Sequence, residues 1–183
     1  MTYQVKDRRI LLKTIPFVVE ELDLVGRSGS LHHPYHRLVC GDWVNILPVT
    51  HDGKAILIRQ PRAGSLTDTL EVPGGLVDPG EKDLMLAALR EMEEETGYTS
   101  QRVLPLGSIN PNPAIMNNRC HFFVALSSFL NPSRKHFPDA EEDITVEVTP
   151  VADLDHLVRT GQIDHALAAL CIMLAAKYIP GNR

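Results

Sequence analysis

The sequence has little of what several protein classes require. Its three cysteines, Cys40, Cys120 and Cys171, match no zinc-ligand spacing, and any disulfide would leave one of them over. We therefore expect reduced thiols that pack as small hydrophobic groups, which suits a cytoplasmic protein. The formal net charge is −5, so the chain lacks the overall positive charge that gathers nucleic acid. An anionic substrate would need local basic residues or a metal ion.

Long apolar segments are missing as well. The longest apolar run, residues 166–176, is far shorter than the ~20 residues that a membrane span needs. Arg8, Arg9 and Lys13 interrupt the apolar stretch at the N-terminus, so no signal peptide is predicted. There is no internal repeat and no low-complexity tract. We therefore expect a protein without a membrane or nucleic-acid partner.

What the chain does have is the composition of an ordinary globular protein. Its 183 residues are 44% hydrophobic and 22% charged, which suits one domain with room for a small extra lobe. Strands and helices follow each other in a mixed order, which predicts an α/β (α+β) fold, a sandwich with a mixed β-sheet. The expected strands are 10–12, 17–24, 35–40, 43–49, 54–60, 70–72, 103–109, 121–126 and 144–148, and the expected helices are 84–96, 151–157 and 164–178.

The helix expected over residues 84–96 carries an acidic cluster. Its apolar residues recur at helical spacing, and Gly97 follows as a stop signal. Glu91, Glu94 and Glu95 lie at positions i, i+3 and i+4, so they share one face. Their repulsion costs ~0.2–0.5 kcal/mol per pair, and the helix dipole disfavours anions near the C-terminus. A bound cation would relieve both effects. Carboxylate oxygens without His or Cys partners suit hard cations, Mg²⁺ before Mn²⁺ or Ca²⁺; the alternative is a solvated acidic face.

The residues around this cluster favour the metal site. Gly74-Gly75 and Pro79-Gly80 predict a tight loop that leads into the helix and lets backbone carbonyls approach a metal. The stretch resembles the Nudix box, whose pattern is Gly, five residues, Glu, seven residues, Arg-Glu, an aliphatic, any residue, Glu-Glu, any residue, Gly, an aliphatic. Gly75, Glu81, Arg90, Glu91, Glu94, Glu95 and Gly97 fall on this pattern, with Tyr98 in the last place. Eight residues separate Glu81 from Arg90, where the family has seven, which leaves the role of Glu81 open.

The resemblance implies a fold, a cofactor and a role for each of these residues. The fold would be the Nudix α/β/α sandwich with a mixed sheet, and the reaction the hydrolysis of a pyrophosphate bond with Mg²⁺, or Mn²⁺ as a substitute. Glu91 and Glu95 would be metal ligands, with the Gly74 carbonyl as a further one. Glu94 would assist catalysis, and Arg90 would pair with a carboxylate and orient it. Water then attacks one phosphorus, and the other phosphate leaves.

Residues outside the box resemble the branch of ADP-ribose pyrophosphatases and other nucleoside diphosphate sugar hydrolases. Gln60-Pro61-Arg62 and Glu71-Val72-Pro73 fit its Gln-x-Arg and Glu-x-Pro, and Pro113 stands fifteen residues past Tyr98, where the branch has a proline. The resemblance implies that ADP-ribose is cleaved to AMP and ribose 5-phosphate. The alternatives are other Nudix substrates, such as nucleoside triphosphates and dinucleoside polyphosphates, and a non-catalytic module that binds a nucleotide sugar. The intact glutamates argue against such a module.

Five residues outside the box are candidates for binding the substrate. Arg62 suits a clamp on the pyrophosphate, with a surface salt bridge as the alternative. By the branch resemblance, Glu71 would contact the substrate or the metal site, and the loop of Pro113 would face the substrate; the alternative for Glu71 is an exposed strand residue. Asn117 is either a substrate contact or a turn cap. Trp43 either packs in the core or stacks on adenine.

An acidic loop lies just before the strand expected over residues 144–148. The branch places an extra acidic residue there, and Glu142 fits it best as a metal ligand or general base, with Glu141 as the second choice. The alternative is a solvated loop. His32, His33 and His36 lack the acidic and cysteine partners of a zinc site, so we expect ordinary loop and strand residues there.

The N-terminal segment predicts assembly. We expect residues 1–45 to add antiparallel strands that serve as a dimerisation element, and residues 46–183 to form the Nudix domain. The apolar stretches 10–12 and 17–19 would not suit a solvated tail, and exposed strand edges recruit partners. By the resemblance, these strands would pack across a two-fold interface and help to complete the neighbour's substrate site. We therefore predict a homodimer; the alternative is a monomer whose N-terminal strands fold back on their own core.

Overall fold

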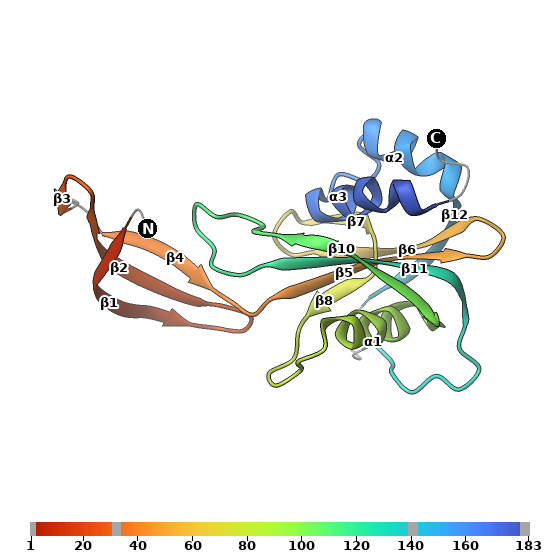
Figure 1. Cartoon of the computed structure of the whole chain (residues 1–183), viewed down its shortest axis with the longest axis horizontal. Coiled ribbons are helices and arrows are strands. Elements are labelled where there is room, and N and C mark those ends of the chain that lie inside the picture. The colour runs from red at the N-terminus through yellow and green to blue at the C-terminus, as the bar shows by residue number, and fades with distance from the viewer. Residues whose placement is uncertain (1–2, 31–33, 139–142, 180–183) are drawn as a thin grey trace. The chain divides into compact units, whose positions relative to one another are not determined.

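The computed structural model describes residues 3–30, 34–138 and 143–179. The chain divides into two compact units, whose main elements are labelled in Figure 1. Unit 1 comprises residues 1–42 and 109–119, and unit 2 comprises residues 43–108 and 120–183. Unit 2 therefore contains the glutamate-rich helix together with the strands that lie within residues 43–108 and 120–183.

Unit 1 is built on a small antiparallel sheet in the order β1-β2-β3, with β4 also paired to β2. Its strands are β1 (Gln4–Lys13), β2 (Val18–Gly26), β3 (Gly29–Ser30) and β4 (Tyr35–Val39). Every residue of β1 is exposed, including Ile10, Leu11 and Leu12, which are each a little over half exposed. β1 thus presents apolar side chains that the described part of unit 1 leaves uncovered.

Residues 109–119 fasten to β4 within the same unit. The N–H of Leu38 donates to the carbonyl of Ile115 at 2.7 Å, and the N–H of Cys40 donates to the Oδ1 of Asn117 at 3.1 Å. His36 lies on β4 and places its Nε2 3.1 Å from the Oε2 of Glu21, as suits a strand residue. His32 and His33 lie outside the described residues.

Unit 2 is built on a mixed sheet in the order β10-β11-β5-β6-β12, with β7 paired to β6, β8 to β5 and β9 to β11. β11 and β5 run parallel, whereas β5, β6 and their other recorded partners run antiparallel. Residues 44–49 of β5 are all buried, as expected for a strand covered on both faces. The strands are β5 (Trp43–Thr50), β6 (Lys54–Arg62), β7 (Thr67–Glu71), β8 (Gly74–Leu76), β9 (Tyr98–Thr99), β10 (Arg102–Ile109), β11 (Cys120–Leu130) and β12 (Thr145–Pro150).

Helices cover this sheet on both sides. Figure 1 shows α1 on one face and α2 and α3 on the other, which confirms the predicted α/β/α sandwich with a mixed sheet. No helix in the described ranges is long and apolar enough to cross a membrane. The helices are α1 (Leu84–Thr96), α2 (Leu154–Arg159) and α3 (Ala166–Ala175), with 3₁₀ turns η1 (Val151–Asp153) and η2 (Ala176–Tyr178).

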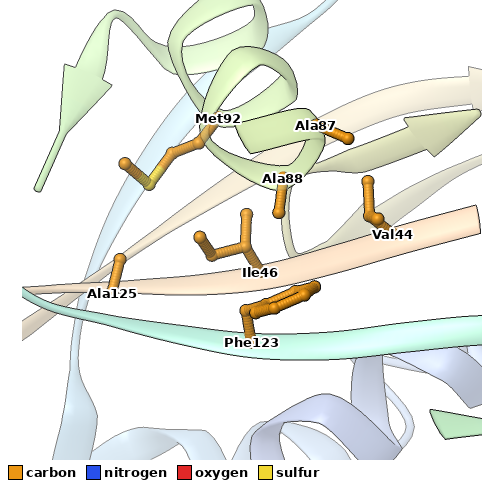
Figure 2. Packing of buried hydrophobic residues seen from close by; sticks show 7 residues of the cluster. All are labelled: Val44, Ile46, Ala87, Ala88, Met92, Phe123 and Ala125. Carbon is orange, nitrogen blue, oxygen red and sulfur yellow. The ribbon is translucent and has the colours of Figure 1, made fainter. Parts of the chain in front are cut away.

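The packing of α1 fixes the direction of its acidic face. Figure 2 shows small and flexible side chains of α1 meeting apolar side chains of β5 and β11. All of them are buried, which fixes the rotation of α1 about its axis and thereby the direction in which Glu91 and Glu95 point. The cluster comprises Val44, Ile46, Ala87, Ala88, Met92, Phe123 and Ala125.

Candidate active site

Capping interactions hold both ends of α1. The side chain of Asp83 accepts hydrogen bonds from the backbone N–H groups of Met85 at 3.0 Å and Leu86 at 3.3 Å. At the other end, Gly97 has a φ of 75°, a left-handed conformation that glycine adopts without strain, and its N–H donates to the carbonyl of Glu93. The helix therefore has defined ends, and its last turn, which carries Glu94 and Glu95, is closed by Gly97.

Arg90 binds the carboxylates around it. Its Nη1 donates to Glu94 at 2.7 Å and to Glu91 at 3.0 Å, and its Nε and Nη2 donate to Glu81 at 3.3 and 3.2 Å. Burial by itself would lower the pKa of Arg90, but these carboxylates raise it above its ordinary value. Arg90 thus offsets the repulsion between Glu91 and Glu94 and orients both; its part in catalysis stays a prediction.

The extra residue between Glu81 and Arg90 does not prevent their pairing. Glu81 accepts hydrogen bonds from Arg90 and also from the backbone N–H of Asp78 at 3.1 Å, and its own N–H donates to the carbonyl of Asp78 at 3.0 Å. Arg90 holds the pKa of Glu81 below its ordinary value, and the Asp78 N–H adds to this effect. The reciprocal bonds close the turn before α1, and Arg90 ties that turn to the helix.

The two glycines at the start of the box lie against Glu91 and Glu95. The N–H of Gly74 donates to the Oε2 of Glu95 at 2.8 Å, and Glu95 is only 8% exposed. A Cβ atom on Gly75 would lie 2.7 Å from the carboxylate of Glu91, so any other residue would collide with it. The absence of a side chain at Gly75 thus brings β8 and the metal-ligand candidates of α1 close together.

The donors at this junction fit a hard divalent cation. Glu91 and Glu95 supply carboxylate oxygens one turn apart, and Gly75, which has no Cβ, lets the Glu91 carboxylate approach the backbone of β8. Within residues 3–30, 34–138 and 143–179, no three His, Cys, Asp or Glu side chains already converge on one point as a complete metal site. Mg²⁺, however, is usually held by one or two carboxylates together with water and substrate phosphates. The arrangement suits an ion that the substrate helps to bind; the Gly74 carbonyl stays a predicted ligand.

Arg62 and Glu71 form a two-point ion pair on adjacent strands. Nε and Nη2 of Arg62 donate to Oε1 and Oε2 of Glu71 at 2.7 and 2.8 Å, and the hydroxyl of Thr69 also donates to Oε1. The side chain of Glu71 is 1% exposed, whereas that of Arg62 is 42% exposed. Arg62 is thus open to a solute, while Glu71 lies beneath it. Substrate binding by these two residues stays a prediction.

His165, which the sequence analysis did not single out, approaches the same carboxylate. Its Nδ1 lies 3.0 Å from the Oε2 of Glu71, an ion-pair distance without the alignment of a hydrogen bond. Burial by itself would raise the pKa of Glu71, but Arg62, His165 and Thr69 together hold it well below its ordinary value. Glu71 is therefore an anion at neutral pH. Since a lone histidine before a helix fits no motif, the sequence carried no signal for this contact.

Glu93 stands at a position of the box that allows any residue, and its side chain holds the loop after β11 against α1 by hydrogen bonds. It is buried, and its Oε1 accepts hydrogen bonds from the Nδ2 of Asn131 at 2.9 Å and from the backbone N–H of Lys135 at 2.6 Å. The N–H of Asn131 also donates to the carbonyl of Gly97 at 2.9 Å. The segment that follows β11 is therefore held at the C-terminal end of α1.

Two basic side chains of this segment, Arg134 and His136, lie close to Glu94. The Nη2 of Arg134 donates to the Glu94 carbonyl at 2.6 Å, and the Nδ1 of His136 lies 3.8 Å from the Glu94 carboxylate. The chain then continues toward residues 139–142. Glu141 and Glu142, the predicted metal ligands or general bases, lie outside the described residues.

Three further predicted substrate contacts lie apart from these clusters in sequence. Trp43 is half-buried at the start of β5, opposite Leu76 of β8. Pro113 and Asn117 are exposed residues of unit 1, where Asn117 accepts the hydrogen bond from Cys40. Contacts of Trp43, Pro113 and Asn117 with a substrate stay predictions.

A cavity of about 610 Å³ lies near the N-terminal end of α1, between that end and strands β10 and β11. Its lining includes Lys82, Met85, Ser108 and His121 but none of the box carboxylates. The glutamates sit at the opposite end of α1, so we place the chemistry at their end and not at this cavity.

Comparison with known proteins identifies the family. The model of the NUDIX domain matches residues 42–169, which include α1 and the sheet of unit 2. The ADP-ribose pyrophosphatase of Bacillus subtilis (strain 168) is 31% identical over 167 residues, which cover 87% of this chain and 84% of that protein. The ADP compounds hydrolase NudE of Escherichia coli (strain K12) is 25% identical over 168 residues, 91% of this chain and 87% of that protein.

A solved structure shows the same fold. The crystal structure of an ADP compounds hydrolase superposes with a TM-score of 0.86 at 23% sequence identity and covers 99% of this chain and 96% of that one. The pattern of glutamates, the α/β/α sandwich and the matching family model agree. The chain therefore belongs to the Nudix hydrolase family.

Proposed function

We propose that this Nudix hydrolase cleaves the pyrophosphate bond of a nucleoside diphosphate sugar, foremost ADP-ribose, to give AMP and ribose 5-phosphate. The relatives named for ADP-ribose and for ADP compounds support this substrate class, because they match the chain over most of its length. The observation that carries the proposal is the short segment from Glu71 to Gly75. It bears the partner of Arg62 at one end and lies against Glu91 and Glu95 at the other.

The short length of this segment supports one shared site for the two clusters. Glu71 and Gly74 are three residues apart, so their Cα atoms lie within about 11 Å even in an extended chain. The guanidinium of Arg62 suits phosphate and the carboxylates of Glu91 and Glu95 suit Mg²⁺, and this short segment contacts both groups. A diphosphate is the substrate group that would use both.

The residues of the chain would share the work in the following way. Glu91 and Glu95 would hold Mg²⁺, which when bound neutralises charge on phosphate oxygens and makes water a better nucleophile. Arg90 keeps the carboxylates of Glu91 and Glu94 oriented, and Arg62 would donate to the phosphate oxygens. Overall, a water oxygen bonds to one phosphorus, the bond from that phosphorus to the bridging oxygen breaks, and a water proton is taken up by a base.

A substrate panel tests the proposal. ADP-ribose, other ADP- and GDP-sugars, ATP and a dinucleoside polyphosphate would be incubated with the protein and Mg²⁺, and the products separated by chromatography. We expect AMP and ribose 5-phosphate as the main products from ADP-ribose. Much faster cleavage of ATP than of any diphosphate sugar would show that the substrate class is wrong. A Glu95→Gln preparation controls for contaminating phosphatases.

The exposed strand β1 supports a homodimer. All ten residues of β1 are exposed, and Ile10, Leu11 and Leu12 form an apolar stretch on it. A two-fold dimer uses the same patch twice, so this one surface would suffice. The predicted role of residues 1–45 as the dimerisation element rests on this exposure.

The thiols favour a reducing compartment, and we propose the cytoplasm. Cys40, Cys120 and Cys171 form no disulfide with one another, and Cys120 and Cys171 are buried. Burial raises the pKa of the Cys171 thiol above its ordinary value, so it stays protonated and unreactive. Thiols of this kind behave as small hydrophobic groups.

A further inference from the structure

We propose that His165 is a positioning residue of the Nudix reaction, which holds the carboxylate of Glu71 so that Arg62 is aimed at the phosphate groups of the substrate. The inference rests on the proposed function, because it takes a diphosphate as the group that Arg62 binds. It assigns a role to a residue that lies outside the box and outside the features that mark the branch.

Three elements converge on the buried carboxylate. Arg62 ends β6, Glu71 ends β7, and His165 stands directly before α3. Oε1 of Glu71 accepts from the Nε of Arg62 and from Thr69, whereas Oε2 has the Nη2 of Arg62 at 2.8 Å and the Nδ1 of His165 at 3.0 Å. Without His165, Oε2 would keep only the Nη2 of Arg62, and the carboxylate would be held by Arg62 and Thr69 alone.

The backbone position of His165 makes its orientation informative. It is the N-cap residue of α3, a place where side chains commonly accept hydrogen bonds from the first helical N–H groups. The His165 side chain makes no such hydrogen bond. Its ring instead lies beside Glu71 and remains 32% exposed. The side chain therefore serves the ion pair and not the end of its own helix.

Arg62 needs such support because it is only partly buried. An arginine side chain loses much conformational freedom when it binds an anion, and groups that hold it beforehand reduce that cost. The two-point pair with Glu71 fixes the plane of the guanidinium. The orientation of this plane therefore depends on the orientation of the Glu71 carboxylate. Thr69 of β7 and His165, directly before α3, hold that carboxylate. Loss of His165 should therefore weaken substrate binding more than the chemical step.

Conservative variants separate the roles open to the histidine. In His165→Asn, the side-chain amide nitrogen is bonded to Cγ as Nδ1 is, so a polar nitrogen stays near the Glu71 carboxylate. In His165→Gln, the amide reaches the place of Nε2, and His165→Leu has no polar atom. The same three variants would be made in an Arg62→Ala background. The measurements are kcat and KM for ADP-ribose, the Kd of inorganic pyrophosphate by calorimetry, and Tm.

We expect His165→Leu and His165→Gln to raise KM and the pyrophosphate Kd about tenfold, the loss of one charge-assisted contact, with little change in kcat. His165→Asn should stay near the wild type. In the Arg62→Ala background, His165→Leu should have no further effect on either constant. The proposal is overturned if the effect persists in that background, if Gln restores binding and Asn does not, or if only Tm changes.

Pyrophosphate binding keeps the inference separate from the choice of substrate. If the wild type binds pyrophosphate through Arg62 but does not cleave ADP-ribose, the proposed substrate is wrong and His165 is judged on pyrophosphate. If Arg62→Ala leaves pyrophosphate binding unchanged, Arg62 does not bind the anion. The inference about His165 is then wrong, whether or not ADP-ribose is cleaved.

Discussion

The backbone N–H of Gly74 donates a hydrogen bond of 2.8 Å to the Oε2 of Glu95. This bond joins β8, which opens the box, to the last turn of α1, which closes it. Because Glu95 is buried and Gly74 pairs with Asn45 of β5, the carboxylate is held in place before any ligand arrives. Preorganised groups of this kind account for much of the rate enhancement of enzymes.

Replacing Glu95 by Gln should lower kcat on the order of 10²- to 10³-fold while the fold is retained. Glutamine has the same shape, and its amide oxygen can still accept from Gly74, but the negative charge that holds a cation is lost. Steady-state kinetics and circular dichroism measure the two effects. Asp155→Asn, an exposed carboxylate of α2, is the control and should leave kcat unchanged. An unfolded Glu95→Gln protein would make Glu95 a structural residue instead.

A methyl group at position 75 should lower the rate of hydrolysis by displacing the Glu91 carboxylate. In Gly75→Ala, the new Cβ would stand 2.7 Å from the Glu91 carboxylate, so that the side chain must move. Displacements of about 1 Å at a catalytic group cost on the order of 10²-fold in rate. Gly64→Ala is the matched control, because its Cβ would meet nothing within 4 Å. Equal activity of the two variants would mean that the position of Glu91 is unimportant.

Chelation should abolish activity without unfolding the protein. EDTA removes the ion that Glu91 and Glu95 would hold, whereas Arg90 keeps the carboxylates of Glu91 and Glu94 paired in the absence of metal. Turnover should fall to background, and Mg²⁺ or Mn²⁺ should restore it, while Tm changes little. Full activity after exhaustive chelation would exclude the metal mechanism.

The sequence predicted α1 well because its signals are local. Apolar spacing, Gly97 and the glutamate pattern all lie within one stretch, and the helix has the predicted bounds Leu84–Thr96. The role of Glu81 stayed open because a count of residues along the chain does not show how a turn absorbs an extra one. The structure resolves this through the reciprocal hydrogen bonds between Asp78 and Glu81.

Contacts across the sheet could not be predicted in the same way. Arg62 and Glu71 were each suggested by the branch pattern, but their ion pair depends on the register between β6 and β7. His165 stands directly before α3, far from Glu71 along the chain, and a histidine at a helix start is a common residue with many roles. Only the packing of α3 on the sheet brings it to Glu71.

The ionised state of Glu71 should appear in the acid stability of the protein. Arg62, His165 and Thr69 outweigh burial and hold its pKa below the 4.5 of an ordinary glutamate. Its stabilising contribution is therefore complete above pH 4.5 and is lost as pH falls toward the lowered pKa. In that window the unfolded chain binds one more proton, so the unfolding free energy falls by up to about 1.4 kcal/mol per pH unit.

Urea unfolding between pH 3 and 7 checks this contribution. Glu71→Gln cannot take up the proton, so its unfolding free energy should be lower at pH 7 and should depend less on pH below 4.5. A variant whose pH dependence parallels that of the wild type would show that Glu71 does not titrate differently in the two states.

The exposed strand β1 leads to a prediction about assembly. Burial of Ile10, Leu11 and Leu12 removes apolar surface from water, at about 25 cal/mol per Å², and a two-fold interface gains this twice. Light scattering at micromolar concentration should give about twice the chain mass of 20.3 kDa.

A charge in the apolar stretch of β1 tests this interface. Ile10→Arg should produce monomers, because a charge would have to be buried at the interface. The strand itself should survive, since the new side chain stands opposite Glu20. Met173→Arg, a change at an exposed methionine of α3, controls for added charge and should remain dimeric. If residues 1–45 also help to form the neighbour's substrate site, the Ile10→Arg monomer should show a raised KM while still requiring Mg²⁺. A wild-type mass near 20.3 kDa with full activity would contradict the dimer, since the apolar stretch of β1 would then be exposed in the working enzyme.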